Sequence, residues 1–95
     1  MSERQIKPFR WNDQKNSQLQ EDRGVGFENV VLAITAGKLL DTIEHPNQEK
    51  YPSQKIFIIE INQYIYLVPF VENDQEIFLK TIIPSRKMKK QYLGE

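Results

Sequence analysis

Several features that mark common classes of protein are missing from this sequence. It has no cysteine, so neither a disulfide nor a thiolate metal site can form. With only one histidine as well, it lacks the ligands of a usual zinc site. It has no glycine-rich phosphate loop, no histidine pair at metal spacing and no Gly-x-Ser-x-Gly motif. We therefore expect no metal and no other cofactor.

Long hydrophobic runs are also missing. No apolar stretch approaches the roughly 18 residues that a membrane helix needs, and no signal-peptide core is present. We expect a cytoplasmic protein without membrane contact. Its 95 residues suit one domain. Within it, residues 1–8 are expected to be a polar, flexible leader.

The chain has no net charge, with 13 basic and 13 acidic residues, but the charge is unevenly distributed. Residues 28–76 contain three bases and eight acids, which gives −5. Residues 77–95 contain five bases and one acid, which gives +4. Only a local basic patch, and not the overall charge, can therefore argue for a nucleic-acid partner.

Two helices are predicted in the N-terminal third of the chain. Asn12 can cap a polar helix over residues 13–23, and Gly24 is a natural stop. A second helix is predicted from Gly26 to Gly37. Its apolar stripe, spaced i, i+3, i+4 and i+7, predicts a helix face packed in the core. The stripe consists of Phe27, Val30, Val31 and Ile34.

The rest of the chain predicts strands. Short strands are expected at Phe9–Trp11 and near Leu39–Ile43, and the polar stretch 41–54 is expected to be a loop. Three longer strands follow at 55–61, 64–71 and 76–83, joined by short turns. Pro69 interrupts the middle strand, so we expect a bulge there. The predicted fold class is α+β: an antiparallel β-meander with two N-terminal helices on one face and a short C-terminal helix.

The C-terminal helix is the most informative segment for function. Ser85 can cap a helix over Arg86–Leu93, and Gly94 can end it. The first two turns contain only basic charges, each opposing the helix dipole by about 0.3–1 kcal/mol. The same helix end favours anions, because its free N–H groups point outward. Three interpretations remain open: contact with phosphate or RNA, contact with an acidic protein, or a solvated basic surface.

RNA cleavage without a metal needs a base, a cation for the phosphate and an acid. Arg86 could hold the phosphate in two hydrogen bonds. His45 could transfer a proton near neutral pH, although a histidine in a loop can equally be only solvated. Tyr51 could instead pack its loop, and Tyr92 could instead attach the last helix to the sheet. Lys15 and Glu28 are further candidates.

The order of several short motifs resembles that of the BrnT toxins of bacterial type II toxin–antitoxin systems. The N-terminal part is carried by FRWN at residues 9–12, KN at 15–16 and RGVGFE at 23–28. The C-terminal part is carried by IIPSRKM at residues 82–88 and by Tyr92. Arg23 stands where that family usually has a histidine, and Asn12 stands where it prefers an aspartate.

This resemblance implies a RelE-like ribonuclease fold, RNA cleavage that blocks translation, and inhibition by a small DNA-binding antitoxin through which the toxin could oligomerise. Together with the chemistry of the residues, it gives two sets of candidates. The catalytic candidates are Arg86, His45 and Glu28, and the candidates for RNA or phosphate binding are Lys15, Ser85, Lys87, Lys89, Lys90 and Tyr92. The alternative function is a non-enzymatic binding module, or a degenerate toxin, whose basic C-terminal patch binds RNA or an acidic antitoxin segment.

Overall fold

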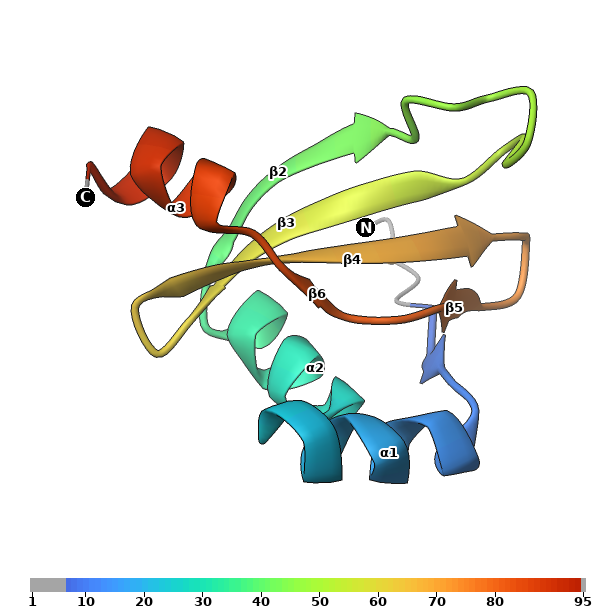
Figure 1. Cartoon of the computed structure of the whole chain (residues 1–95). Coiled ribbons are helices and arrows are strands. Elements are labelled where there is room, and N and C mark those ends of the chain that lie inside the picture. Colours follow the sequence, from blue (N-terminus) through green and yellow to red (C-terminus); the bar gives the residue numbers. More distant parts are fainter. Residues whose placement is uncertain (1–6, 95) are drawn as a thin grey trace, which may run out of the picture.

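The computed structural model describes residues 7–94 and has an α+β fold (Figure 1). Of the expected leader, only Lys7 and Pro8 lie within the described residues; the others lie outside them. Nine elements follow in chain order. They are β1 (Phe9–Arg10), α1 (Asp13–Arg23), α2 (Phe27–Thr35), β2 (Leu39–Glu44), β3 (Lys55–Ile61), β4 (Tyr64–Glu72), β5 (Ile77–Leu79), β6 (Ile83–Pro84) and α3 (Arg86–Leu93).

The helix ends lie close to where local sequence signals put them. The Asn12 side chain accepts the N–H of Lys15 at 2.9 Å and caps α1, and Gly24, with φ of 72°, ends that helix. The Ser85 side chain caps α3 in the same way, and Gly94 ends it. The second helix is shorter than the expected Gly26–Gly37, because the chain leaves helical geometry at Ala36.

The sheet is mixed, so the expectation of a purely antiparallel meander is wrong. Its strand order is β1-β5-β4-β3-β2, with β6 also paired to β4. Neighbouring strands are antiparallel except β1, which runs parallel to β5. The reason is non-local. The first strand enters from the far end of the chain and adds to the edge left open by β5.

The expected third strand, residues 76–83, is broken in two, and Pro69 explains the break. The Pro69 carbonyl accepts the N–H of Lys80 at 2.8 Å, so the ring nitrogen faces this same neighbour. Having no N–H, Pro69 cannot complete the ladder there. Residues 68 and 69 of β4 consequently face residues 80–82, between β5 and β6. Three residues, 80–82, thus face two residues of β4, so the extra residue lies in the segment between β5 and β6. Strand β4 pairs with β3 without a register shift.

Two further differences concern β2. Expected near Leu39–Ile43, it runs on to Glu44, so the loop begins at His45 and not at residue 41. A register shift between Leu39 and Asp41 marks a bulge at Leu40. The predicted turn at Asn62–Gln63 is confirmed, with φ of 52° and 64°, as a two-residue hairpin of this type requires.

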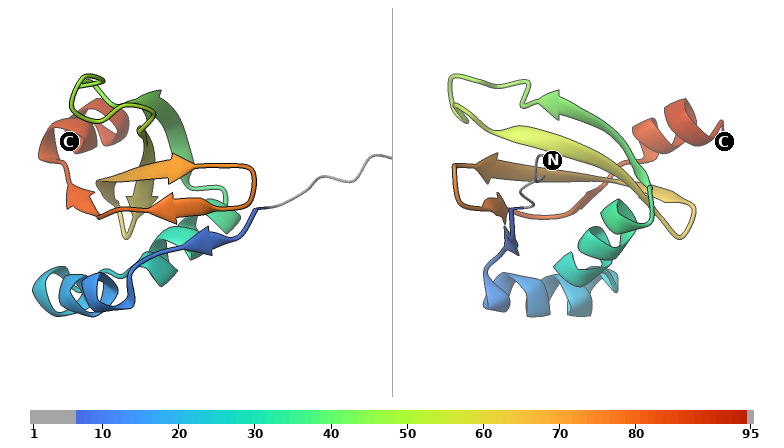
Figure 2. Two further views of the ribbon diagram at one scale, coloured as in Figure 1. Left: turned by 90° about the vertical axis from the view of Figure 1, so that its right-hand side faces the viewer. Right: turned by 180° about the vertical axis from the view of Figure 1, so that it is seen from behind.

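The main core lies between the sheet and the two N-terminal helices. Phe27 and Val30 of α2 are fully buried and pack against Phe57 and Ile59 of β3. The face of α2 is rotated slightly from the expected stripe, because Ala33 is buried while Ile34 is only half-buried. This packing positions both helices on one face of the sheet, as predicted (Figures 1 and 2).

The opposite face of the sheet is covered in part by α3 (Figure 2). Alternate residues of β3 and β4 point to this second face, and Ile56, Ile58 and Ile65 are buried there. Burial on both faces explains the nearly continuous apolar runs of the central strands. Helix α3 has no buried residue of its own, so it is a surface helix lying on the sheet.

Candidate functional site

Helix α3 presents the basic side chains that the sequence singled out. The Ser85 hydroxyl accepts the N–H of Met88 at 3.2 Å, which fixes the start of the helix. Arg86 and Lys87 are exposed in its first turn, which contains no acid. Lys89 lies one turn along, with its Nζ 5.3 Å from the centre of the Tyr64 ring. These residues and the exposed Lys90 are called here the α3 basic surface.

Besides the contact of Lys89 with Tyr64, two hydrogen bonds hold α3 and its capping residue against the sheet. The N–H of Ser85 donates to the Ile65 carbonyl at 3.0 Å. The Tyr92 hydroxyl donates to Oδ2 of Asp41 on β2 at 3.3 Å. Burial raises the pKa of Tyr92, as do the negative charge of Asp41 and its hydrogen bond. In this structure Tyr92 therefore holds the helix against the sheet.

His45 and Tyr51 lie together in the loop between β2 and β3. Their ring centres are 4.4 Å apart, and His45 Nδ1 accepts the N–H of Asn47 at 3.0 Å. That hydrogen bond assigns the ring proton of the neutral histidine to Nε2. This loop and α3 lie at opposite ends of β2 (Figure 1). His45 lies four residue steps along the extended chain from Asp41, a span of about 13 Å.

Lys15 and Glu28 lie on the other face of the sheet, with α1 and α2. The Glu28 carboxylate accepts hydrogen bonds from Nδ2 of Asn16 at 2.9 and 3.0 Å, and from Nε2 of Gln20 at 3.1 Å. The hydrogen bond from Asn16 lowers the pKa of Glu28, aided by backbone N–H donation and by Gln20. A carboxylate held in its charged form is poorly suited to donating a proton at neutral pH.

The candidate residues thus form three groups, and the structure does not bring them into one site. Ser85, Arg86, Lys87, Lys89, Lys90 and Tyr92 belong to α3; His45 and Tyr51 share a loop; Lys15 and Glu28 belong to the two N-terminal helices. The α3 basic surface can attract and hold an anion. The loop that contains His45 and helix α2, which contains Glu28, both lie away from α3 (Figure 1), so neither residue is placed to exchange a proton with that anion.

Asn16 is a key residue that the sequence analysis did not single out for structure. It is the only buried polar residue among residues 7–94, with 7% of its surface exposed. Its Oδ1 accepts the N–H of buried Phe27 at 2.7 Å, while its Nδ2 holds Glu28. It thereby supplies an acceptor for one of the free N–H groups at the start of α2. Its spacing of three residues from Leu19 was the signal that it faces the core.

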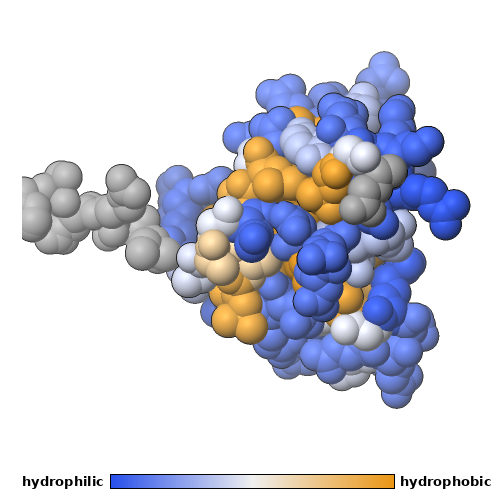
Figure 3. Space-filling model, turned by 90° about the vertical axis from the view of Figure 1, so that its left-hand side faces the viewer, coloured by the Kyte–Doolittle hydropathy of each residue, from blue (hydrophilic) through white to orange (hydrophobic). Residues whose placement is uncertain are grey.

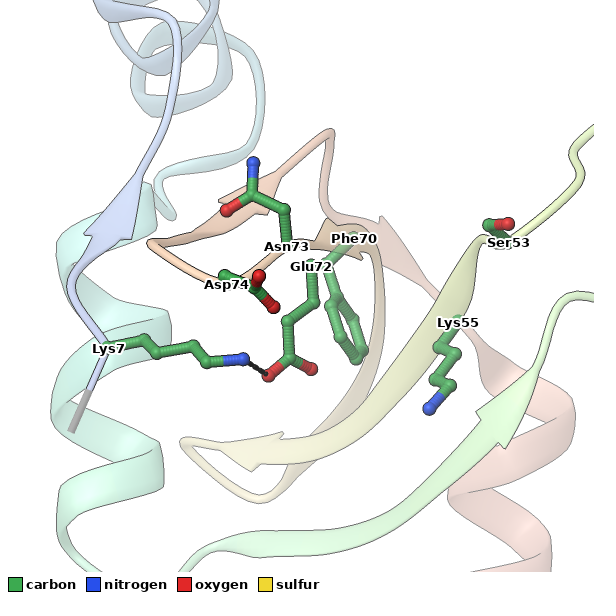
Figure 4. Close-up of a pocket in the computed structure, with 7 residues that line it drawn as sticks. All are labelled: Lys7, Ser53, Lys55, Phe70, Glu72, Asn73 and Asp74. Carbon is green, nitrogen blue, oxygen red and sulfur yellow. Dashed lines mark hydrogen bonds and ion pairs between the residues drawn. The ribbon is translucent and has the colours of Figure 1, made fainter. Parts of the chain in front are cut away.

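A groove beside the turn between β4 and β5 contains both acidic and basic side chains (Figure 4). It encloses about 370 Å³ and contains Lys55, Glu72 and Asp74, with Phe70 at its wall. Glu72 is already paired with Lys7 across the groove, at 2.6 Å. The groove therefore shows no strong preference for an anion or a cation.

The described residues, 7–94, offer neither a cluster of metal ligands nor a membrane-spanning helix. No group of three or more histidine, aspartate or glutamate side chains is placed there to hold a metal ion. No helix in that part of the chain is long and apolar enough to cross a membrane.

Comparison with protein-family models, with curated proteins and with solved structures gave no match to this chain. The likeness to BrnT toxins and to the RelE fold consequently stays a prediction from motif order.

Proposed function

We propose that this protein binds RNA through the α3 basic surface and acts in the cytoplasm as the toxin of a type II toxin–antitoxin pair. The observation that carries the proposal is the charge of α3. Residues 86–93 contain four bases and no acid, in a chain with no net charge overall. The motif order that resembles BrnT toxins gives independent support for the toxin assignment.

The physical basis of the proposal is that this distribution of charge destabilises the helix itself. Arg86 and Lys87 stand in the first turn of α3, where positive charge opposes the helix dipole. A bound phosphate reverses the sign of that interaction, since it accepts hydrogen bonds from free helix N–H groups and pairs with the cations. Arg86 can hold two phosphate oxygens at once, and the lysines add non-directional attraction along an RNA strand.

Binding is better supported than cleavage. A metal-independent ribonuclease needs a group that takes a proton beside the group that holds the phosphate. The loop that contains His45 and helix α2, which contains Glu28, both lie away from α3 (Figure 1). We therefore favour RNA binding as the activity of α3, with an antitoxin as the partner that blocks it, over strand cleavage by these residues.

Fluorescence anisotropy with a labelled single-stranded RNA tests the binding. The wild type is compared with Arg86→Gln/Lys87→Gln at several salt concentrations. A matched control, Lys50→Gln/Lys55→Gln, removes the same charge from exposed positions outside α3. We expect the α3 variant to bind more weakly and to flatten the plot of log K against log salt by about 1.4, since each lost contact to single-stranded RNA removes about 0.7. Equal weakening by both double variants would contradict the proposal.

Cleavage and toxicity are tested separately from binding. Wild type and Arg86→Ala are incubated with total RNA, and growth is followed after each is expressed in bacteria. Growth arrest that depends on Arg86, without RNA cleavage, is expected from a toxin that acts by binding. Cleavage that depends on Arg86 would instead restore the ribonuclease interpretation and call for a proton-transfer group near α3.

A further inference from the structure

The face of the sheet that α3 covers in part continues beyond the helix as partly open surface. Ile65, Leu67 and Val71 point to this face, because they are an even number of residues apart on β4. Val71 pairs in register with Phe78 of β5, and both are half-buried without belonging to the core between the sheet and the N-terminal helices. Ile83, which pairs with Leu67, is 42% exposed. Leu67, Val71, Phe78 and Ile83 are called here the open sheet face.

Two cations flank Phe78 on this face. Arg10 of β1 pairs in register with Phe78, so the two side chains point to the same side of the sheet. The Nζ atom of Lys80 lies 5.6 Å from the centre of the Phe78 ring, within the range of a cation–π contact. Both cations are exposed and have no ion-pair partner within residues 7–94, where the one ion pair is Lys7–Glu72. A half-buried aromatic ring therefore stands between two unpaired positive charges.

The charge of this face is positive overall. Two acids at the same end of the sheet, Glu72 and Asp74, line the groove beside Phe70, which belongs to the core on the other face (Figure 4). On the α3 face, Arg10 and Lys80 add to the four bases of α3. The acids of this face are Asp41 and Glu60 on its strands and Glu76 just before β5. Bases therefore outnumber acids there, which favours a negatively charged ligand.

We propose that the bases of single-stranded RNA stack on the open sheet face, with Phe78 as the platform and with Arg10 and Lys80 as phosphate contacts. This inference rests on the proposed binding of RNA by the α3 basic surface and adds the class of RNA and the place of its bases. Proteins that bind single strands combine aromatic side chains, on which bases stack, with cations that follow the phosphates. In a duplex the bases are stacked on each other and are not free to use such a ring.

The aromatic ring is what separates this face from other exposed apolar surface. Leu32 on α2 is 66% exposed, and the end of the molecule that contains the end of α2 and the β3–β4 turn shows apolar areas between polar ones (Figure 3). Exposure alone therefore identifies no ligand. Each nucleotide places a flat ring beside a negative charge, and Phe78 with its two cations complements both. An acidic protein segment matches only the charge.

The open sheet face leads from Phe78 to α3. Val71, the partner of Phe78, lies six residues along β4 from Ile65, whose carbonyl accepts the N–H of Ser85, and this separation is about 20 Å. About six nucleotides at about 3.4 Å each span that distance. One short strand of RNA can therefore place a base on Phe78 and a phosphate on Arg86.

Fluorescence anisotropy with two labelled oligonucleotides tests the stacking. One is a single-stranded RNA, and the other is an abasic oligonucleotide of the same length and charge. We expect the wild type to bind the RNA roughly fivefold or more tightly than the abasic oligonucleotide. Phe78→Leu should lose most of this preference and bind the abasic oligonucleotide as before, which also shows that the variant is folded. The matched control is Tyr66→Leu, which removes a half-buried ring from the helix face and should keep the preference.

The same assay at several salt concentrations tests the phosphate contacts. Arg10→Gln/Lys80→Gln should weaken the binding of both oligonucleotides and flatten the RNA plot of log K against log salt by about 1.4, because two phosphate contacts are lost. The control Lys50→Gln/Lys55→Gln should leave that slope unchanged.

Three results would overturn the proposal. They are equal affinity of the wild type for the two oligonucleotides, as expected for a surface that binds an acidic protein, a preference for RNA that survives Phe78→Leu, and equal loss of that preference in Tyr66→Leu. An unchanged salt slope in Arg10→Gln/Lys80→Gln would overturn the phosphate contacts. The proposed role of α3 fails by a different result, an unchanged affinity of Arg86→Gln/Lys87→Gln for the abasic oligonucleotide.

Discussion

Replacing Asn16 by alanine should destabilise this protein far more than truncation of an exposed residue on α1. The substitution removes the acceptor of the Phe27 N–H, which lies at the start of α2 in a fully buried residue. A buried donor left without a partner costs about 1–3 kcal/mol. The loss of a helix cap, which concerns the same N–H, costs a similar amount and is not counted again. The exposed Glu28 carboxylate can turn to water, so its lost bonds add little. We expect about 2 kcal/mol in total.

That loss is large for a domain of this size. At about 0.05–0.15 kcal/mol per residue, a 95-residue chain has a free energy of unfolding of roughly 5–14 kcal/mol. A loss of about 2 kcal/mol should lower the melting temperature by roughly 8–16 °C. Urea unfolding followed by circular dichroism gives the free energy directly, with the slope of the transition unchanged.

The control for this experiment is Gln18→Ala on the same helix. Gln18 is exposed, and its truncation should stay within about 0.5 kcal/mol of the wild type. A second variant, Asn16→Asp, keeps an acceptor for Phe27 but sets a carboxylate against Glu28. Asn16→Asp should lower the free energy of unfolding at neutral pH, and adding Glu28→Gln should restore part of that free energy. If Asn16→Ala cost no more than Gln18→Ala, the structural role given to Asn16 would be refuted.

Three further predictions follow from neighbouring contacts. The folded pKa of Glu28 lies below its ordinary value of 4.5. The contribution of Glu28 to stability is therefore fully present above that value and is lost as pH falls through the folded pKa. Glu28→Gln should remove this part of the acid sensitivity, measured by urea unfolding between about pH 6 and pH 3. Gly26→Ala should destabilise the fold by about 1–3 kcal/mol, because the new Cβ would lie 2.5 Å from Nε2 and 2.8 Å from Cγ of Gln20, and adding Gln20→Ala should recover part of the loss in thermal melts. Tyr92 should ionise above its ordinary pKa of 10.0, since burial and Asp41 raise it; Asp41→Asn should lower that pKa in an ultraviolet titration, and an unchanged titration would contradict the contact. The stability that this raised pKa provides is present below the ordinary pKa and is lost as pH rises through the folded one.

The local structure around the candidate residues was predicted more successfully than the arrangement of those residues in space. The cap at Ser85 and the charges after it are written in consecutive residues, so the sequence located the α3 basic surface correctly. It could not reveal that His45 stands at the far end of β2, nor that Glu28 is held by Asn16 on the other face of the sheet. Those distances depend on how the strands pair, which is set by contacts between residues far apart in the chain.

The sequence by itself determined the parts of this protein that depend on neighbouring residues. Asn12 and Gly24 set the ends of α1, and Asn62 made the tight turn between β3 and β4. The tertiary structure alone decided the parts that depend on distant residues. Pro69 breaks a strand that lies beside it in the sheet and not along the chain. The outward position of Leu32 likewise follows from packing, because periodicity marks a helix as apolar but not which of its sides will find a partner.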